Sequence, residues 1–326
     1  MGIASKEILK KALRGRSLSR NEARKIYLDP AIELFDLLCT ANSVRKSCTD
    51  GHIELCSIVN AKSGNCSEDC RFCAQSARHR AAVDTYPLLK TPAIVAAALS
   101  ARKNGATCFG IVTSGEKIRS AEEMSAIRDA ITTIKKKAPG LRCSVSIGSV
   151  TGSYLKELRR AGLDRFHHNL ETSERFFPRM CTTHTYRDRL KTLTAAKRAG
   201  VKICCGGIFG IGEDRDDRID LAFALKKLKA DSVPLNFLHP VPGTPLGSAA
   251  PLPVVEILRT IALFRIVLPT AEIKVCGGRE VNLGAAQRLI FFAGASGMMI
   301  GNYLTQPGND PADDLKMLRE LGLKVK

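Results

Sequence analysis

The sequence contains no tryptophan, only five tyrosines and no apolar run long enough to cross a membrane. Its longest apolar stretches, residues 257–268 and 289–300, are interrupted by Arg or Gly, whereas a spanning helix needs about 20 apolar residues. Bases stack on aromatic side chains, so their scarcity argues against specific nucleic-acid binding despite a formal charge of +18. We therefore expect neither a membrane nor a nucleic-acid partner.

The amino-terminal segment, residues 1–16, is charged and lacks the apolar core of a secretory signal, so we expect a cytoplasmic protein. Twelve cysteines in that reducing compartment would make a poor disulfide framework, and metal ligation is the better interpretation. The excess of 50 Lys and Arg over 32 Asp and Glu is spread along the chain, and it favours anionic partners such as small carboxylates.

From about residue 50 the chain repeats one unit, a β-rich run, a loop and an amphipathic helix that ends at a glycine. Gly105, Gly140, Gly162 and Gly200 each close such a helix, because glycine takes the left-handed conformation there at little cost. Strands are expected at 52–59, 107–112, 141–147, 164–170, 201–206, 232–238, 272–276 and 298–300. Helices are expected at 92–102, 121–137, 154–160, 187–199, 216–229, 254–267 and 283–294.

Eight such units over roughly 250 residues predict a (βα)8 TIM-type barrel. Alternation alone does not say whether the sheet closes, so a doubly wound open sheet is the alternative. Residues 1–50 are rich in Arg, Lys, Leu and Glu, and we interpret them as an N-terminal helical extension outside the barrel. Residues 51–326 would form the barrel together with its C-terminal segment.

The most informative segment holds three cysteines, Cys66, Cys70 and Cys73, spaced Cys-x3-Cys-x2-Cys in the loop after the first strand. Two of them could close a disulfide, which a reducing compartment disfavours. Zinc would need a fourth ligand, which His79 could provide. An iron–sulfur cluster takes thiolates, and three cysteines leave one iron of a four-iron cubane open to a small chelating molecule. We favour the cluster.

This spacing, with the aromatic Phe72 before the last cysteine, resembles the radical S-adenosylmethionine superfamily. More narrowly, the chain resembles the biotin synthase family over residues 40–325, because several further motifs fall in that family's order. They are NCSEDC with CAQSARH (65–70 and 73–79), HNLETS (168–173), TYRDRL (185–190), GGIFGIGE (206–213), VPLN (233–236) and GRE (278–280).

The resemblance implies an enzyme, a sulfurtransferase that inserts sulfur into dethiobiotin to form biotin. It implies that Cys66, Cys70 and Cys73 hold a [4Fe-4S] cluster whose open iron chelates S-adenosylmethionine. A low-potential flavodoxin- or ferredoxin-like electron donor and a homodimer are implied as well. Two alternatives remain open. One is another radical enzyme of the same subgroup, similar to a hydrogenase-cofactor maturase, and the other is an iron–sulfur or zinc-stabilised RNA-binding protein.

The resemblance also implies which residues bind the cofactor. Phe72 would pack near the adenine, and the loop that holds Ser114 and Glu116 would run along the bound molecule. Glu171 would bind the ribose hydroxyls, and Arg189 would pair with the carboxylate of S-adenosylmethionine.

Two asparagines are implied at the substrate. Asn169 would lie between cofactor and substrate, and Asn236 would bind the ureido ring of dethiobiotin. Since Asn169 and Glu171 are two residues apart on a strand, they share one face and can both point into the barrel mouth.

A further implication is an auxiliary iron–sulfur cluster that supplies the inserted sulfur. The family's [2Fe-2S] form uses three strand cysteines and an arginine. This sequence keeps two of the positions at Cys143 and Cys204, and it has Gly110 and Lys274 at the others. Lysine must lose a proton before it can bind metal, so it is a poor substitute for arginine. Cys108 shares a strand face with Gly110, and Cys276 shares one with Lys274. The expected interior set is therefore Cys108, Cys143, Cys204 and Cys276, and four cysteines favour a four-iron cluster over [2Fe-2S].

The remaining cysteines and histidines have no informative spacing, and we expect structural roles for them. They are Cys39, Cys48, Cys56, Cys181 and Cys205, and His52, His167, His168, His184 and His239.

Overall fold

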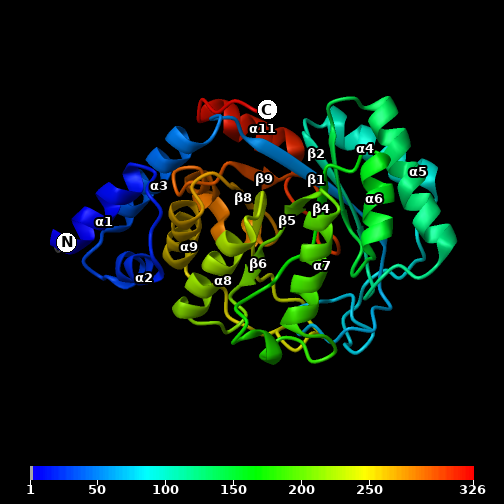
Figure 1. The fold of residues 1–326 in the computed structure, drawn as a ribbon, viewed down its shortest axis with the longest axis horizontal. Helices are drawn as coiled ribbons and strands as arrows, with labels where there is room; N and C mark the ends of the chain where they lie inside the picture. Colours follow the sequence, from blue (N-terminus) through cyan, green and yellow to red (C-terminus); the bar gives the residue numbers. More distant parts are fainter. Residues whose placement is uncertain (1–2) are drawn as a thin grey trace.

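Within residues 3–326, which the computed structural model describes, nine short parallel strands form one closed sheet (Figure 1). They are β1 (Glu54–Lys62), β2 (Cys108–Thr113), β3 (Arg142–Ser146), β4 (Arg165–His167), β5 (Lys202–Cys204), β6 (Gly207–Phe209), β7 (Ser232–Phe237), β8 (Glu272–Val275) and β9 (Gly297–Met299). β1 pairs with β2 and β9, and β7 pairs with both β5 and β6, so the sheet closes on itself. Because β5 and β6 are two parts of one interrupted strand, the barrel has eight strand positions. The predicted (βα)8 barrel is confirmed, and the open sheet is excluded.

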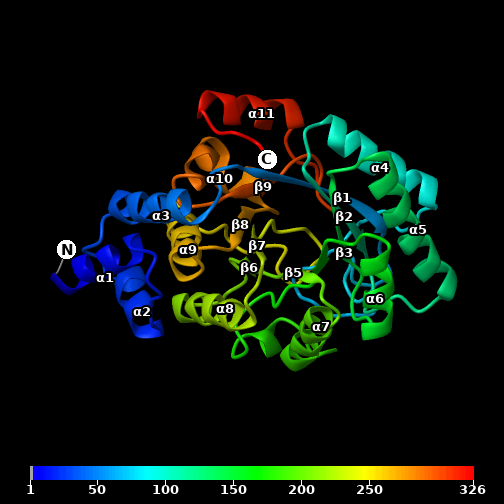
Figure 2. The ribbon, with the colours of Figure 1, turned by 45° about the horizontal axis from the view of Figure 1, so that its top comes forward.

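Helices surround the strands on the outside of the barrel (Figure 2). They are α4 (Thr91–Lys103), α5 (Ala121–Lys137), α6 (Gly152–Arg160), α7 (Tyr186–Arg198), α8 (Arg215–Leu228) and α9 (Val254–Val267), with a short 3-10 helix, η1 (Phe177–Arg179), before α7. After β9 the chain forms α11 (Pro311–Glu320). None of the helices within residues 3–326 is long and apolar enough to span a bilayer.

The helix expected at 283–294 is not continuous. The chain instead forms α10 (Arg279–Leu283) and then a 3-10 helix, η2 (Gly284–Ile290). Gly284 has a φ of 47° and caps the carboxyl end of α10, so the α-helix does not continue through it. The amphipathic pattern predicted the apolar side of this segment but not its break.

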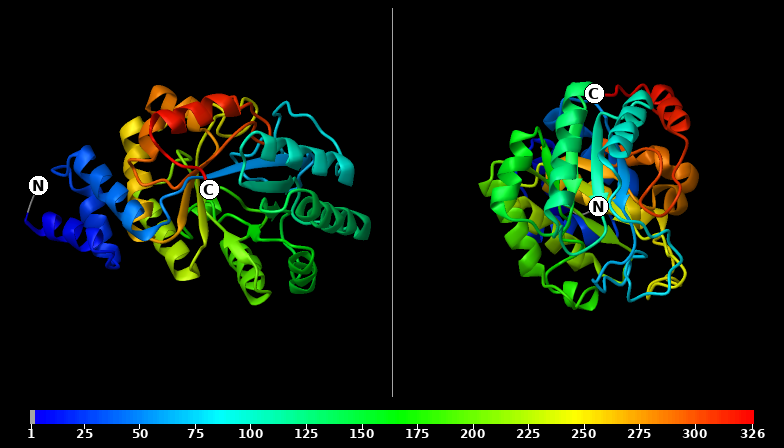
Figure 3. Two further views of the ribbon diagram at one scale, coloured as in Figure 1. Left: turned by 90° about the horizontal axis from the view of Figure 1, so that it is seen from above. Right: turned by 90° about the vertical axis from the view of Figure 1, so that its right-hand side faces the viewer.

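Three helices precede the barrel and lie at one side of it, next to α8 and α9 (Figure 3). They are α1 (Ile3–Leu13), α2 (Arg20–Leu28) and α3 (Leu34–Cys48). Tyr27 of α2 is buried, and its hydroxyl lies 3.0 Å from Oγ1 of Thr260 on α9. Arg20 pairs with Asp220 of α8 at 2.6 Å. The division of the chain near residue 50 stays a prediction.

Side chains at alternate strand positions fill the barrel in layers. The first residues of four strands, Glu54, Arg142, Arg165 and Glu272, form a charged layer at the amino-terminal end. Glu54 lies 3.0 Å from Arg142 and 2.6 Å from Arg165, and Glu272 lies 3.3 Å and 2.6 Å from the same two arginines. Lys274, one layer higher, pairs with Glu54 at 2.6 Å. Ion pairs therefore close the floor of the barrel.

Glu54 is the centre of this layer. Its side chain is fully buried, and that of Lys274 is 2% exposed. Burial alone would raise the pKa of the Glu54 carboxyl, but the positive charges of Lys274, Arg165 and Arg142 outweigh burial and hold the pKa well below its usual range. Glu54 is therefore an anion at neutral pH and balances the cations around it.

Replacement of Glu54 by Gln should lower the free energy of unfolding by about 3–5 kcal/mol, because buried cations lose their partner. The loss should be measured by chemical denaturation of the full chain at neutral pH. Since the folded-state pKa of Glu54 is lowered, its contribution is present at neutral pH and disappears progressively as the pH falls below the unfolded value of about 4.3.

The matched control is Glu320→Gln, which removes the exposed ion pair with Arg288. This change should cost less than about 1 kcal/mol. Equal losses for the two variants would contradict a structural role for Glu54.

Candidate active site

A cavity of about 790 Å³ lies at the carboxyl ends of the strands, above the charged floor. Arg165 and Lys274 form part of its base. Residues predicted to bind iron, cofactor and substrate line this one cavity: Cys66, Cys70, Phe72, Cys73, Cys108, Ser114, Glu116, Asn169, Glu171, Arg189, Cys204, Asn236, Lys274 and Cys276. Cys143 is not among the lining residues.

The loop after β1 turns its three cysteines toward this cavity. Cys66 N–H donates to the Gln75 carbonyl at 3.0 Å, and Cys73 N–H donates to the Cys70 carbonyl at 2.9 Å, so the loop folds back on itself. His79, the candidate fourth ligand for zinc, instead contacts the Cys70 carbonyl through Nε2 at 3.0 Å. The loop thus offers three sulfurs, a donor set that suits an iron–sulfur cluster.

Two of these thiols keep their protons in the free protein. Burial raises the pKa of Cys73 to about 11, although N–H groups of Gln75 and Ser76 act against it. A hydrogen bond with Cys181, together with burial, raises the pKa of Cys70. Cluster ligands must be thiolates, so binding of the metal releases protons here.

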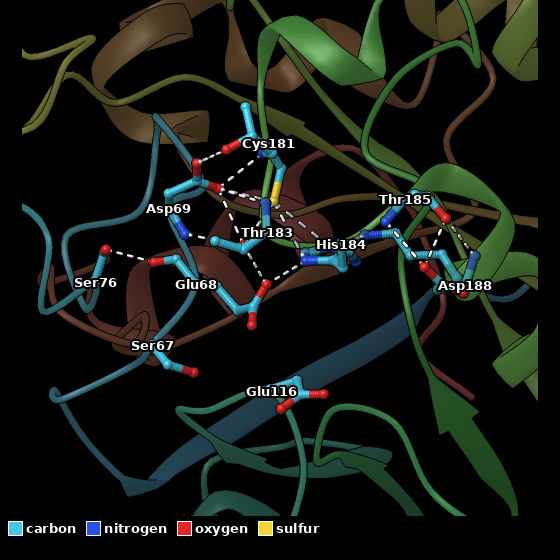
Figure 4. A network of polar contacts seen from close by, with 12 residues as sticks. Ser67, Glu68, Asp69, Ser76, Glu116, Cys181, Thr183, His184, Thr185 and Asp188 are labelled. Atoms are coloured by element: carbon cyan, nitrogen blue, oxygen red, sulfur yellow. Dashed lines mark hydrogen bonds and ion pairs between the residues drawn. The ribbon is translucent and has the colours of Figure 1, made fainter.

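Two carboxylates within the loop fasten it to residues 181–185, the segment before α7 (Figure 4). Asp69 accepts the N–H of Thr182 at 2.9 Å and the thiol of Cys181 at 3.2 Å. Glu68 contacts Nδ1 of His184 through its carboxylate. The loop after β1 that contains Cys66, Cys70 and Cys73, which we call the cluster loop, is therefore held against the start of α7.

A capping box fixes the start of α7. The Thr185 hydroxyl accepts the Asp188 N–H at 3.2 Å, and the Asp188 carboxylate accepts the Thr185 N–H at 3.1 Å. One turn into the helix, Arg189 reaches the cavity, where it donates to Nε2 of His184 at 3.0 Å and to the Asn169 carbonyl at 2.8 Å. Its guanidinium is thus oriented from two sides.

Glu171 has a left-handed backbone, with a φ of 69°, which is strained for a residue with a side chain. Such strain concentrates at functional sites. Burial raises the pKa of its carboxyl, and the carboxylate lies 3.6 Å from Arg189 and accepts from the Asn169 amide at 3.3 Å. The residues predicted to bind the cofactor therefore form one connected polar group.

Three other predicted contacts occupy the walls. Ser114 is buried, and its hydroxyl donates to the Gly64 carbonyl at 2.7 Å. Glu116 pairs with Arg119 at 2.9 Å and stands apart from the network of Figure 4. Phe72 is half-buried and packs against the core.

Asn236 is held by backbone on both sides. Its amide donates to the Gly207 carbonyl at 3.1 Å, and its oxygen accepts the Gly277 N–H at 3.0 Å. Gly207 also pairs with Glu171 across the break between β5 and β6, and a Cβ on Gly207 would collide with the Glu171 carbonyl oxygen. The predicted substrate residue and the predicted cofactor residue thus contact the same glycine.

Deeper in the barrel, directly above the floor, four thiols face the cavity: Cys56, Cys108, Cys204 and Cys276. Cys56 lies opposite Cys108 in the parallel register of β1 and β2. Cys143, which the sequence placed in this set, points elsewhere. Ser144 and Ser146 of its strand border the cavity, so Cys143 faces the opposite side, where it is part of the apolar core.

Lys274 remains an ammonium ion among these thiols. Burial would lower its pKa, but Cys56, Glu54 and Cys108 raise it, so it has no lone pair for a metal. Its Nζ lies 3.1 Å from the Cys56 sulfur. A hydrogen bond from Cys56 lowers the pKa of Cys108 to about 7, with support from Lys274 and against burial. One of the two sulfurs is thus readily deprotonated, as a metal ligand must be.

Gly110 is closely surrounded, so a side chain at its position would require its neighbours to shift slightly. A Cβ there would lie 3.0 Å from the Ile58 methyl and 3.1 Å from the Ser144 hydroxyl. Cys108, on the same strand face and two residues earlier, therefore offers a sulfur one layer deeper.

Three residues for which we expected only structural roles lie at the site or beside the loop of the three cysteines: Cys56, Cys181 and His184. Cys56 could have been found, because the two-residue period that turns Glu54 inward also turns Cys56 inward. Cys181 and His184 reach the cluster loop only through the packing of two irregular segments, for which no sequence period exists.

Two family models match the chain. The Radical SAM superfamily matches residues 61–225, and the Biotin and Thiamin Synthesis associated domain matches residues 234–324. The fold resembles that of methylornithine synthase, with a TM-score of 0.84, 19% identity and coverage of 98% of this chain and 97% of that protein. It also resembles an FeFe-hydrogenase maturase from Carboxydothermus hydrogenoformans, with a TM-score of 0.81, 18% identity and coverage of 98% and 78%. At such identities these two likenesses show the fold alone.

Sequence relatives are more specific. A biotin synthase from Geotalea uraniireducens is 46% identical over 313 residues, which cover 96% of this chain and 95% of the relative. Biotin synthases from Citrifermentans bemidjiense and Geobacter metallireducens are 46% and 47% identical, with coverage of 98% and 95% of this chain and of 97% and 94% of the relatives. Identity at this level over nearly the whole length shows that the chain belongs to the biotin synthase family of the radical S-adenosylmethionine superfamily.

Proposed function

We infer that this chain forms biotin by inserting sulfur into dethiobiotin in a reaction that consumes S-adenosylmethionine. The observation that carries this inference is the 46% identity to biotin synthases over 96% of the chain. The C–H bonds that sulfur replaces are unactivated, so no general base in the cavity can start the reaction. A [4Fe-4S] cluster with bound S-adenosylmethionine supplies the one-electron chemistry that is needed.

The three cysteines of the cluster loop and the polar residues near the start of α7 would bind different parts of the cofactor. Cys66, Cys70 and Cys73 would hold the cluster, because all three border the cavity from one loop. Arg189 would bind the cofactor carboxylate and Glu171 its ribose hydroxyls. Both side chains are less than 15% exposed, so little water competes for them. Phe72, Ser114 and Glu116 would complete the walls around the adenosyl group.

Asn169 and Asn236 would orient dethiobiotin, with Asn169 nearer the cofactor. Asn236 already has its amide fixed by Gly207 and Gly277, which leaves it one defined orientation toward the substrate. A fixed polar group of this kind positions a substrate at little entropic cost.

For the auxiliary cluster we propose four sulfur ligands: Cys56, Cys108, Cys204 and Cys276. Cys56 takes the place of Cys143 in this set because of the strand faces described above. An all-sulfur set of four, with Lys274 as a charged neighbour rather than a ligand, favours a four-iron cluster over [2Fe-2S].

The electron donor would be an acidic, low-potential protein of the flavodoxin or ferredoxin type. Three exposed arginines, Arg71, Arg78 and Arg179, lie in or beside the cluster loop, and none forms an ion pair within residues 3–326. A hydrogen bond of 3.0 Å from Arg71 N–H to the Met180 carbonyl brings two of them together. Such a basic surface attracts an acidic carrier. The homodimer and the cytoplasmic location stay predictions.

Replacement of Cys66 by Ala should reduce 5′-deoxyadenosine and biotin formation more than about 100-fold. Mutation of a residue that only hydrogen-bonds to a metal ligand already lowers metal affinity or activity by about 10–100-fold, and loss of the ligand itself should cost more. The assay is anaerobic incubation with dethiobiotin, S-adenosylmethionine and a low-potential reductant. His79→Ala removes the residue that would be the fourth ligand of a zinc site, and this variant should still form both products. Deoxyadenosine without biotin from the unmodified chain would indicate another substrate.

Replacement of Cys56 or Cys108 by Ala should abolish biotin formation and lower the iron content, while deoxyadenosine formation continues. Cys143→Ala is the matched control, because this thiol is buried, as Cys108 is, but faces the outer side of its strand, and the variant should keep its iron. Loss of auxiliary iron in Cys143→Ala alone would overturn the proposed ligand set. Mössbauer spectra that show a diamagnetic two-iron signal beside that of the cluster on Cys66, Cys70 and Cys73 would reject the four-iron assignment.

Charge reversal of Arg71 and Arg179 to Glu should slow deoxyadenosine formation about 10-fold or more when an acidic ferredoxin is the donor. Dithionite should support the variant as well as the unmodified chain. Arg102→Glu, at the far end of α4, is the control and should not change the rate with either reductant. Equal rates with ferredoxin for both variants would place the donor elsewhere.

A further inference from the structure

Cys181 is a buried thiol that the proposed reaction does not use. Its exposed fraction is 3%, and its sulfur, the Cys70 sulfur and a ring nitrogen of His184 all lie within 4.8 Å of one another. Figure 4 shows Cys181 in the segment before α7, beside Asp69 of the cluster loop. Cys181 is therefore in reach of one of the three proposed cluster ligands.

Two backbone segments pass each other in opposite directions at this point. Arg71 N–H donates to the Met180 carbonyl at 3.0 Å, and the Asp69 carboxylate accepts the N–H of the residue after Cys181 at 2.9 Å. Cys70 lies between Asp69 and Arg71, and Cys181 follows Met180. The two cysteines are therefore held next to each other by the contacts on either side of them. Their sulfurs lie within 4.8 Å of each other, so a small movement of the two side chains brings them to the S–S distance of about 2.05 Å of a disulfide.

The two sulfurs differ in access. Cys70 lines the cavity, through which a small oxidant can reach it. Cys181 does not line the cavity; it lies behind Cys70 and contacts Asp69, Thr183 and His184. A thiol that borders a cavity, with a second thiol beside it that does not, is the arrangement of a reactive cysteine and its resolving partner.

We propose that Cys181 is a resolving thiol that joins Cys70 in a reversible disulfide when the chain carries no cluster. The Cys70 thiol passes its proton along its hydrogen bond to Cys181, and hydrogen peroxide oxidises the resulting Cys70 thiolate to a sulfenic acid while the peroxide itself is reduced to water. The Cys181 sulfur then attacks the Cys70 sulfur, the S–S bond forms, and a second water leaves. A thiol reductant restores both groups.

The consequence for the enzyme rests on the proposed role of Cys70 as a cluster ligand. Without a resolving thiol, further peroxide converts a sulfenic acid to a sulfinic acid, which thiols do not reduce. The disulfide instead keeps the ligand recoverable, so the chain can be reloaded with iron and sulfide after oxidative loss of its cluster.

The first test is mass spectrometry of the full-length, cluster-free chain after mild peroxide treatment. Trypsin should release residues 63–71 linked to residues 180–187. Since the first peptide contains both Cys66 and Cys70, Cys66→Ser should keep the link, and Cys70→Ser should lose it. Absence of the linked peptide from the unmodified chain overturns the proposal. This readout needs no activity, so its failure leaves the proposed function intact.

The second test measures recovery of the cluster. Peroxide-treated chain should regain most of its iron–sulfur absorbance after thiol reduction and reconstitution, whereas Cys181→Ala should regain several-fold less and should carry a sulfinic acid at Cys70. Cys205→Ala, which removes another buried thiol, is the control and should recover as the unmodified chain does. Untreated Cys181→Ala and Cys181→Ser show whether the variants fold and load. Equal recovery with and without Cys181 overturns the proposal.

Discussion

One buried carboxylate, Glu54, allows cations and thiols to share the interior of this barrel. Arg142, Arg165 and Lys274 would repel one another in a medium of low dielectric constant, and each would be costly to bury alone. Glu54 contacts all three, and Glu272 shares the two arginines. Lys274 can therefore keep its charge directly beside Cys56 and Cys108. Together with the hydrogen bond from Cys56, the charge of Lys274 thus helps to lower the pKa of Cys108 above the floor.

The fold was predictable from local signals, because glycine helix ends and short β-rich runs recur along the chain. The bounds expected for two helices, 121–137 and 254–267, are those of α5 and α9. The break at Gly284 was missed, since an amphipathic pattern does not reveal where a glycine takes a positive φ. At the site, the alternation of side chains along a strand correctly predicted that Cys108 and Cys276 face the cavity. The alternation does not reveal which of the two alternating sets of side chains in a strand points inward. For β3 that choice depends on its neighbours, and Ser144 rather than Cys143 lines the cavity.

Segments without regular structure explain what the sequence could not reveal. The cluster loop meets the start of α7 through Glu68 and Asp69, which contact His184 and Thr182. From His184 the contacts continue to Arg189 and on to the Asn169 carbonyl. Residues more than a hundred positions apart are thus linked by side-chain hydrogen bonds, and no periodicity predicts such links. The residues proposed to bind iron and those proposed to bind the cofactor are thus joined by one network of hydrogen bonds.

The interruption between β5 and β6 limits how this enzyme can be redesigned. Gly207 touches the backbone of Glu171 on one side and the amide of Asn236 on the other. Because no side chain fits at Gly207, the spacing between these two residues cannot be tuned there. A designer who enlarges the pocket for a bulkier dethiobiotin analogue by moving Asn236 would also shift the strained turn at Glu171. With the roles proposed for Asn236 and Glu171, substrate range and cofactor binding would therefore change together in this scaffold.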